Sequence, residues 1–165
     1  NIRKVFSKFT EEIISKKNYG IDGCSAPQYA FTIEKLGKAL SNLLNSYNGK
    51  FEYSKNIQIM INAILANPKF IGGSNNLDSN LIKISNKNIF CKGGAEGVFL
   101  FVHLKKEIFG ILKVKDGNER ALPSAIYTLL KKFGILDKEQ FVSWNKTNLY
   151  NHAKIKVGSI TTIIE

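Results

Sequence analysis

Apolar residues along the first half of the chain recur at intervals of three and four positions, with lysine, glutamate and asparagine between them. This spacing places the apolar side chains on one face and predicts amphipathic α-helices. The predicted helices span residues 4–17, 32–46, 54–67 and 77–85. Thr32 and Ser54 are suited to cap the second and third of these helices, and Gly20 and Pro68 stand where the first and third must end.

Two segments between these helices are rich in glycine, serine and asparagine, and this composition predicts loops at residues 20–29 and 71–76. The first loop carries three reactive groups within four residues, namely the carboxylate of Asp22, the thiol of Cys24 and the hydroxyl of Ser25.

Beyond residue 88 the apolar residues gather in short runs rich in β-branched and aromatic side chains, which predict β-strands. The predicted strands span residues 89–91, 98–104, 108–115 and 155–164. Asp116-Gly117 is typical of a hairpin turn, and a helix is predicted from Pro123 to Gly134. This order predicts an α+β fold in which helices flank an antiparallel sheet.

A glycine-rich segment, Cys91-Lys92-Gly93-Gly94-Ala95-Glu96-Gly97, joins two of the predicted strands. Glycines allow the backbone to approach a ligand closely or to adopt positive φ. They also mark bulges at hairpin ends, so the segment is either a ligand-contacting turn or a purely structural one. A nucleotide-binding loop is disfavoured, because neither G-x-x-x-x-G-K-[ST] nor a following helix is present.

The size and composition of the chain limit the class of protein to which it can belong. At 165 residues, with 44% hydrophobic and 22% charged residues, the chain fits one globular domain spanning residues 1–165. No apolar run approaches the roughly 20 residues that span a bilayer, and residues 1–4 lack the hydrophobic segment of a signal peptide. We therefore expect a cytoplasmic protein without a membrane partner.

The formal net charge of +11 raises the question of nucleic-acid binding. Among the 24 basic residues only Arg3 and Arg120 are arginine, the residue that favours bidentate contacts to phosphates and bases. The lysines occur singly or in pairs, which favours a solvated surface over a dedicated nucleic-acid interface.

Cysteine and histidine give little chemistry by themselves. Cys24 and Cys91 are too few for a disulfide scaffold and stand in no Cys/His ligand cluster, so this chain alone is not expected to complete a four-ligand zinc site. His103 alternates within a predicted strand and His152 lies in a polar loop, with no nucleophile at motif spacing beside either. We do not expect a catalytic histidine.

Six segments in register resemble a known enzyme family. They are GIDGCSAPQYAF, NPKFIGGSNNLDSNLI, CKGGAEGVF, KVKDG, NERALPSAIYTLL and KKFGIL. In this order and spacing, from about residue 15 to near the C-terminus, they resemble the C-terminal half of the rhizobial-type, thermolabile, zinc-containing L-asparaginases. The resemblance implies hydrolysis of L-asparagine to L-aspartate and ammonia, on a fold similar to the serine β-lactamases and glutaminases.

The resemblance also implies roles for particular residues. Lys92 matches the lysine of the K-[TG]-G-A-E-G turn, which is similar to the active-site K-T-G strand of β-lactamase-like enzymes. Gly93 and Gly94, which follow it, are expected to bind the substrate. As a neutral amine Lys92 would be a base, and as an ammonium it would stabilise the oxyanion or the substrate carboxylate; both roles stay open. Asp22 or Glu96 is expected to bind the substrate α-ammonium, or else to stabilise its own loop.

For the metal, Cys24 matches the cysteine that binds zinc in this family, so the resemblance implies a zinc cofactor whose other ligands lie elsewhere. The family draws those ligands from a C-S-G-K-H segment and its nucleophile from an S-x-x-K segment.

This chain departs from the family at both segments. It lacks the C-S-G-K-H segment. Ser7-Lys8 and Ser54-Lys55 have the wrong spacing for the nucleophile, and Ser79 is not followed by the lysine that the motif requires. We therefore expect the C-terminal part of a longer asparaginase, completed by a missing N-terminal half or by a second copy. The alternative is a non-catalytic binding module or remnant of the same fold.

Overall fold

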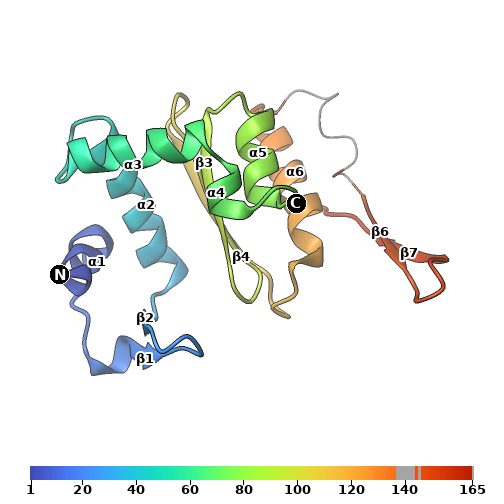
Figure 1. Ribbon diagram of the computed structural model, residues 1–165, viewed down its shortest axis with the longest axis horizontal. Helices are drawn as coiled ribbons and strands as arrows, with labels where there is room; N and C mark the ends of the chain where they lie inside the picture. Colours follow the sequence, from blue (N-terminus) through green and yellow to red (C-terminus); the bar gives the residue numbers. More distant parts are fainter. Residues whose placement is uncertain (137–143, 145, 165) are drawn as a thin grey trace.

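A computed structural model describes residues 1–136, 144 and 146–164. It shows an α+β fold in which helices flank small antiparallel sheets, as the sequence predicts (Figure 1). The helices are α1 (Ile2–Thr10), α2 (Ile33–Tyr47), α3 (Ser54–Ala66), α4 (Lys69–Gly72), α5 (Leu77–Ile84) and α6 (Leu122–Lys132). The strands are β1 (Tyr19–Ile21), β2 (Pro27–Tyr29), β3 (Ile89–Gly94), β4 (Val98–His103), β5 (Ile108–Lys113), β6 (Thr147–Tyr150) and β7 (Lys156–Ile160). The short 3-10 helices η1 (Lys16–Asn18) and η2 (Glu119–Ala121) precede β1 and α6.

The central sheet has the strand order β3-β4-β5 and is antiparallel throughout. Helix α5 packs against β3, helix α2 contacts β5, and α5 and α6 lie on the other side of the sheet from α1 and α2 in Figure 1. The core between these layers is apolar, and Ile61, Leu81, Phe99 and Ile126 are fully buried in it. Burial of this apolar surface is what fixes the helices to the sheet.

Three predicted helices are confirmed, although Ser54 does not cap α3, because Tyr53 takes the N-cap position and Ser54 is the first residue of the helix. Thr32 caps α2 by accepting a hydrogen bond from the Lys35 amide at 3.3 Å. Helix α3 ends at Ala66, before Pro68, and α6 carries Pro123 in its first turn and is followed by Gly134 at φ +61°. These caps satisfy helix-terminal groups without tertiary contacts, which is why the sequence reveals them.

Other expectations are wrong. The first helix ends at Thr10 instead of residue 17, because Glu11 adopts the left-handed conformation at φ 52°. The predicted loop at residues 20–29 contains strands β1 and β2, and the loop at 71–76 begins with the last two residues of α4. The turn at Asp116-Gly117 leads to η2 and α6 and closes no hairpin.

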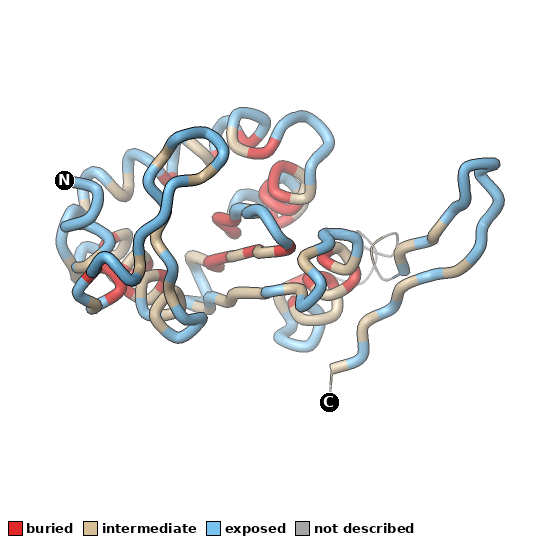
Figure 2. Tube along the Cα trace, turned by 90° about the horizontal axis from the view of Figure 1, so that it is seen from below, coloured by how far each residue is buried: buried red, intermediate tan, exposed pale blue. Residues whose placement is uncertain are grey.

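The third sheet is a separate hairpin formed by β6 and β7, with an irregularity in register between Leu149 and Tyr150. Figure 2 shows it extending away from the rest of the protein, with no buried residue along its length. Strand β6 was not predicted from the sequence, whereas β7 was. Among the described residues, no helix combines the length and the hydrophobicity needed to cross a bilayer.

Candidate functional site

The glycine-rich segment is mostly strand. Cys91, Lys92, Gly93 and Gly94 form the end of β3, and only residues 95–97 make the turn to β4. The register between β3 and β4 is continuous from Ile89 to Gly94, so the bulge considered as the structural alternative does not form. Strand β3 is an edge strand of the central sheet, which leaves one side of its backbone available for other partners.

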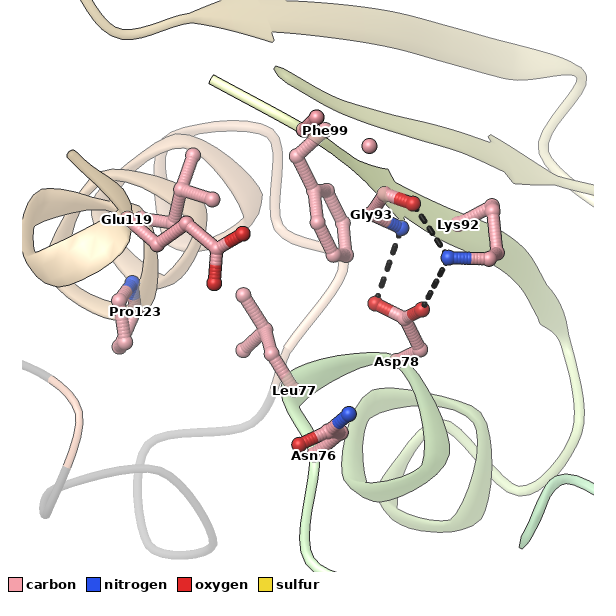
Figure 3. A pocket seen from close by; sticks show the side chains of 11 residues that line it. Asn76, Leu77, Asp78, Lys92, Gly93, Phe99, Glu119 and Pro123 are labelled. Carbon is pink, nitrogen blue, oxygen red and sulfur yellow. Dashed lines mark hydrogen bonds and ion pairs between the residues drawn. The ribbon is translucent and has the colours of Figure 1, made fainter. Parts of the chain in front are cut away.

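Lys92 lies beside a buried carboxylate from another element. Its Nζ is 3.3 Å from Oδ2 of Asp78 and also donates a hydrogen bond to the carbonyl oxygen of Gly93 (Figure 3). The other carboxylate oxygen of Asp78 accepts a hydrogen bond from the Gly93 amide at 3.0 Å. The Asp78 side chain is 8% exposed and the Lys92 side chain 45%, so a nearly buried anion meets a half-exposed cation.

Asp78 owes its position to the first turn of α5, whose inward face also carries the buried Leu81 and Ile82. Asp78 stands three and four positions before these residues, on the same face of the helix. A carboxylate on an otherwise apolar face is uncommon unless it is paired. That pattern was the signal that could have identified Asp78 from the sequence, where it was missed.

Gly93 and Cys91 both contact Asp78. A Cβ atom at Gly93 would lie 3.1 Å from Oδ1 of Asp78, tighter than an ordinary contact, so the glycine permits the close approach of helix and strand. Cys91 is fully buried, and its Sγ donates to the Asp78 carbonyl oxygen at 3.4 Å. Burial, and then the Asp78 charge, raise the pKa of the Cys91 thiol, which keeps it protonated and unreactive.

A cavity of about 360 Å³ opens beside the ion pair. Its polar walls include Asp78, Lys92 and Glu119, and its apolar walls include Leu77 and Phe99. The remaining lining residues are Asn76, Gly93, Gly94, Ala95, Leu122 and Pro123. A cavity that combines apolar side chains with a few convergent charged groups is a common form of small-molecule site.

The Asp78 carboxylate bears on the two roles left open for Lys92. Oδ2 of Asp78, 3.3 Å from Nζ, holds the end of the Lys92 side chain at the cavity wall by an ion pair. The Gly93 carbonyl oxygen, which also accepts from Nζ, holds it in the same position. The geometry therefore suits Lys92 to electrostatic stabilisation of a developing negative charge.

Glu119 also lines the cavity and was not singled out from the sequence. It begins η2, and in Figure 3 its carboxylate points toward Leu77 and Phe99 from the wall opposite Lys92. The sequence offers no periodic signal for it, because it lies in an irregular connection that tertiary structure brings to the sheet.

Glu96, a predicted substrate-binding residue, lies in the turn at φ 62° and is not among the residues that line the cavity. Its Oε2 would be 3.3 Å from a Cβ atom placed on Gly117, so its side chain covers that neighbouring turn. Its carbonyl oxygen accepts a hydrogen bond from Nζ of Lys113 at 2.8 Å. These contacts favour the structural interpretation of Glu96, while its role in substrate binding stays a prediction.

Asp22 and Cys24 lie in the loop of the β1–β2 hairpin, outside the lining of the Lys92 cavity. Asp22 accepts hydrogen bonds from the amides of Cys24 and Ala26, at 2.8 and 3.0 Å, and from the Gln28 side chain at 2.8 Å. The Ala26 amide, followed by Gln28, lowers the pKa of the Asp22 carboxyl. Asp22 thus shapes its own loop, and its predicted contact with substrate stays a prediction.

For the zinc ion implied by the resemblance, Cys24 offers an exposed thiol. Asp22, the nearest acidic residue in sequence, already accepts three hydrogen bonds. Within the described ranges, no group of three or more His, Cys, Asp or Glu side chains is placed to hold a metal ion. These residues therefore do not by themselves fit a zinc site, and Cys24 would supply one ligand at most.

The sequence also contains one S-x-x-K spacing that the resemblance does not align with the nucleophile, from Ser143 to Lys146. Ser143 lies outside the described residues.

Comparison with known proteins agrees with the six-segment resemblance. The model of the L-asparaginase II family matches residues 1–162 of the chain. No curated protein sequence matches it.

Proposed function

The chain belongs to the L-asparaginase II family, and from this premise we propose that it is an amidohydrolase that converts L-asparagine to L-aspartate and ammonia. The observation that supports this activity is the placement of Lys92 on the glycine-rich edge of β3, at the wall of a cavity and paired with the buried Asp78. A cation held at the wall of a cavity is suited to stabilise an anion that develops there.

In this proposal a serine Oγ attacks the side-chain amide carbon of asparagine and loses its proton to a base. Negative charge then develops on the amide oxygen, and Lys92 stabilises that charge. The carbon–nitrogen bond breaks, the nitrogen leaves with a proton as ammonia, and water hydrolyses the acyl-serine ester to release L-aspartate. Asp78 positions Lys92, because it holds Nζ from the side of the helix.

The serine itself comes from outside the described lining of the cavity, which contains no serine, threonine or cysteine. Ser79 is adjacent to Asp78 but fully buried, and its hydroxyl is bonded to the carbonyl oxygens of Pro68 and Gly73 at 2.9 and 2.6 Å. We propose that a segment bearing the S-x-x-K motif completes the site, provided by an N-terminal half or by a second copy. Cys24 would then contribute one zinc ligand to the completed site.

The test is ammonia release from L-asparagine by the purified protein, alone and after co-expression with a family segment that carries S-x-x-K and C-S-G-K-H. We expect release only with the added segment. Release by the protein alone would show that the nucleophile is already present. A stable complex without release would reject the hydrolase and favour the non-catalytic binding module.

A further inference from the structure

We propose that Glu119 binds the α-ammonium group of the amino-acid substrate and is the residue that selects for it. This inference rests on the proposed asparaginase site, because it assigns the opposite wall of the same cavity. It names a residue that neither the family match nor the sequence motifs assign to substrate.

The charge of the cavity wall favours a cationic ligand. The titratable side chains among the described lining residues are Asp78, Lys92 and Glu119. Asp78 and Lys92 form an ion pair and so offset one another. The Glu119 carboxylate leaves the wall with one net negative charge, and this favours a ligand that carries a cationic group.

The Glu119 carboxylate is available to a ligand, whereas the Asp78 carboxylate is not. Both carboxylate oxygens of Asp78 are already engaged, one by the Gly93 amide and one by Lys92. Among the described residues, the carboxylate of Glu119 has no hydrogen-bond or ion-pair partner, and Figure 3 shows none. Arg120, the adjacent cation, is paired with Asp116. A carboxylate that faces a cavity and has no protein partner is suited to a ligand ammonium.

Glu119 and Lys92 line the cavity from opposite walls. Glu119 comes from η2 and Lys92 from β3, and Leu77 and Phe99 lie between them in Figure 3. A short zwitterion that places its ammonium at Glu119 can extend its side-chain amide toward Lys92. Both Glu119 and Lys92 are exposed, so a ligand can reach both charged groups from solvent. Asp22 and Glu96, the candidates from sequence, do not line this cavity.

Local structure holds Glu119 in place. The Asn118 side chain caps η2 by accepting the Arg120 amide at 2.9 Å, and the Glu119 carbonyl accepts the Leu122 amide. The backbone of Glu119 is thus fixed while its side chain remains available to the cavity, as a binding residue requires.

The experiment measures binding by calorimetry, with L-asparagine and with succinamic acid, which is asparagine without its α-amino group. Glu119→Gln keeps the shape of the side chain and removes its charge. We expect it to weaken L-asparagine binding 10- to 100-fold and succinamic acid binding less than 3-fold. Glu107→Gln, an exposed glutamate in the β4–β5 turn bonded to Asn48, is the matched control and should change neither. Thermal melts should agree for all three proteins.

The outcomes separate this inference from the proposed function. Binding that depends on Glu119 without hydrolysis in any form would retain the inference and reject the hydrolase. Equal losses for both ligands, no loss with L-asparagine, a loss that follows Glu96→Gln instead, or no binding of L-asparagine by the unmodified protein would each overturn the inference. Where turnover is present, KM for L-asparagine should rise with little change in kcat.

Discussion

Replacing Lys92 by methionine tests the site most directly, because it retains the apolar stem and removes the charge. From the sequence, removal of the Lys92 charge is expected to lower turnover and to change folding little. The structure changes that expectation, since the substitution leaves the Asp78 carboxylate, 8% exposed, with the Gly93 amide as its one remaining donor among the described residues.

The cost in stability can be worked from the distance between the charges. For Nζ and Oδ2 at 3.3 Å, the Coulomb energy is about 5 kcal/mol at an effective dielectric constant of 20 and about 1.3 kcal/mol in water. The Lys92 side chain is 45% exposed, which places the net value near the lower limit. We expect Lys92→Met to lower the free energy of unfolding by about 1–2 kcal/mol. That corresponds to a fall in Tm of roughly 2–8 °C for a chain of this size.

The expected loss of activity is larger than the loss of stability. If Lys92 stabilises the developing oxyanion, turnover in the active form should fall about 100-fold or more, or roughly 3 kcal/mol of transition-state stabilisation. The assay pairs ammonia release with denaturant unfolding, measured well below the lowered Tm. Lys87→Met, in the exposed turn before β3, is the control and should leave both readouts unchanged.

A double-mutant cycle separates the two effects. Asp78→Asn can still accept the Gly93 amide but carries no charge, so the double variant should recover part of the stability that Lys92→Met loses. It should not recover turnover. Near-native turnover in Lys92→Met would refute a catalytic role for Lys92, and an unchanged free energy of unfolding would refute the stabilising ion pair.

Three further predictions address other regions. Native protein should be labelled rapidly by a thiol reagent at the exposed Cys24 and only on unfolding at the buried Cys91, and comparable rates at both would contradict the structure. Burial, and then the charges of Lys106 and Lys105, lower the pKa of His103, whose Nδ1 accepts a hydrogen bond from the Lys106 amide at 3.1 Å. The unfolded chain therefore binds a proton at His103 more readily than the folded protein does. The free energy of unfolding should accordingly fall as pH drops below about 6.5. His103→Gln should flatten that dependence in unfolding titrations, and an unchanged slope would exclude His103 as its source. Affinity for duplex DNA at 0.15 M salt should be about 10⁻⁴ to 10⁻⁶ M or weaker and should collapse as salt rises; a sub-micromolar, sequence-dependent affinity would contradict a merely solvated lysine surface.

The sequence was informative where structure is set locally. The cap at Thr32, the proline at 123 and the glycine at 134 each satisfy helix ends through neighbours in the chain, and all three were predicted. The glycine-rich segment also directed attention to Lys92. Prediction from the sequence failed where the structure depends on partners distant in the chain. Strand β6, for example, contains only two apolar residues and is defined by its pairing with β7.

The candidate site shows the same difference between features set locally and features that depend on distant residues. The ion pair joins Asp78 and Lys92, which are fourteen positions apart in the sequence. No short-range sequence pattern predicts such a contact. Glu119 reaches the cavity only because η2 folds back beside the sheet. Asp22 and Cys24 were identified by resemblance to a family motif, and their hairpin explains their local contacts without testing the functions expected of them.

The contacts around Gly93 have a further consequence for how the protein behaves at high concentration. Gly93 lies on an edge strand, where an outward amide and carbonyl normally invite a strand from another molecule. Here the Asp78 carboxylate accepts the amide and the Lys92 ammonium donates to the carbonyl. The same two side chains proposed to serve the active site therefore also block this end of β3 against edge-to-edge self-association, so selection on solubility and selection on activity would act on the same residues.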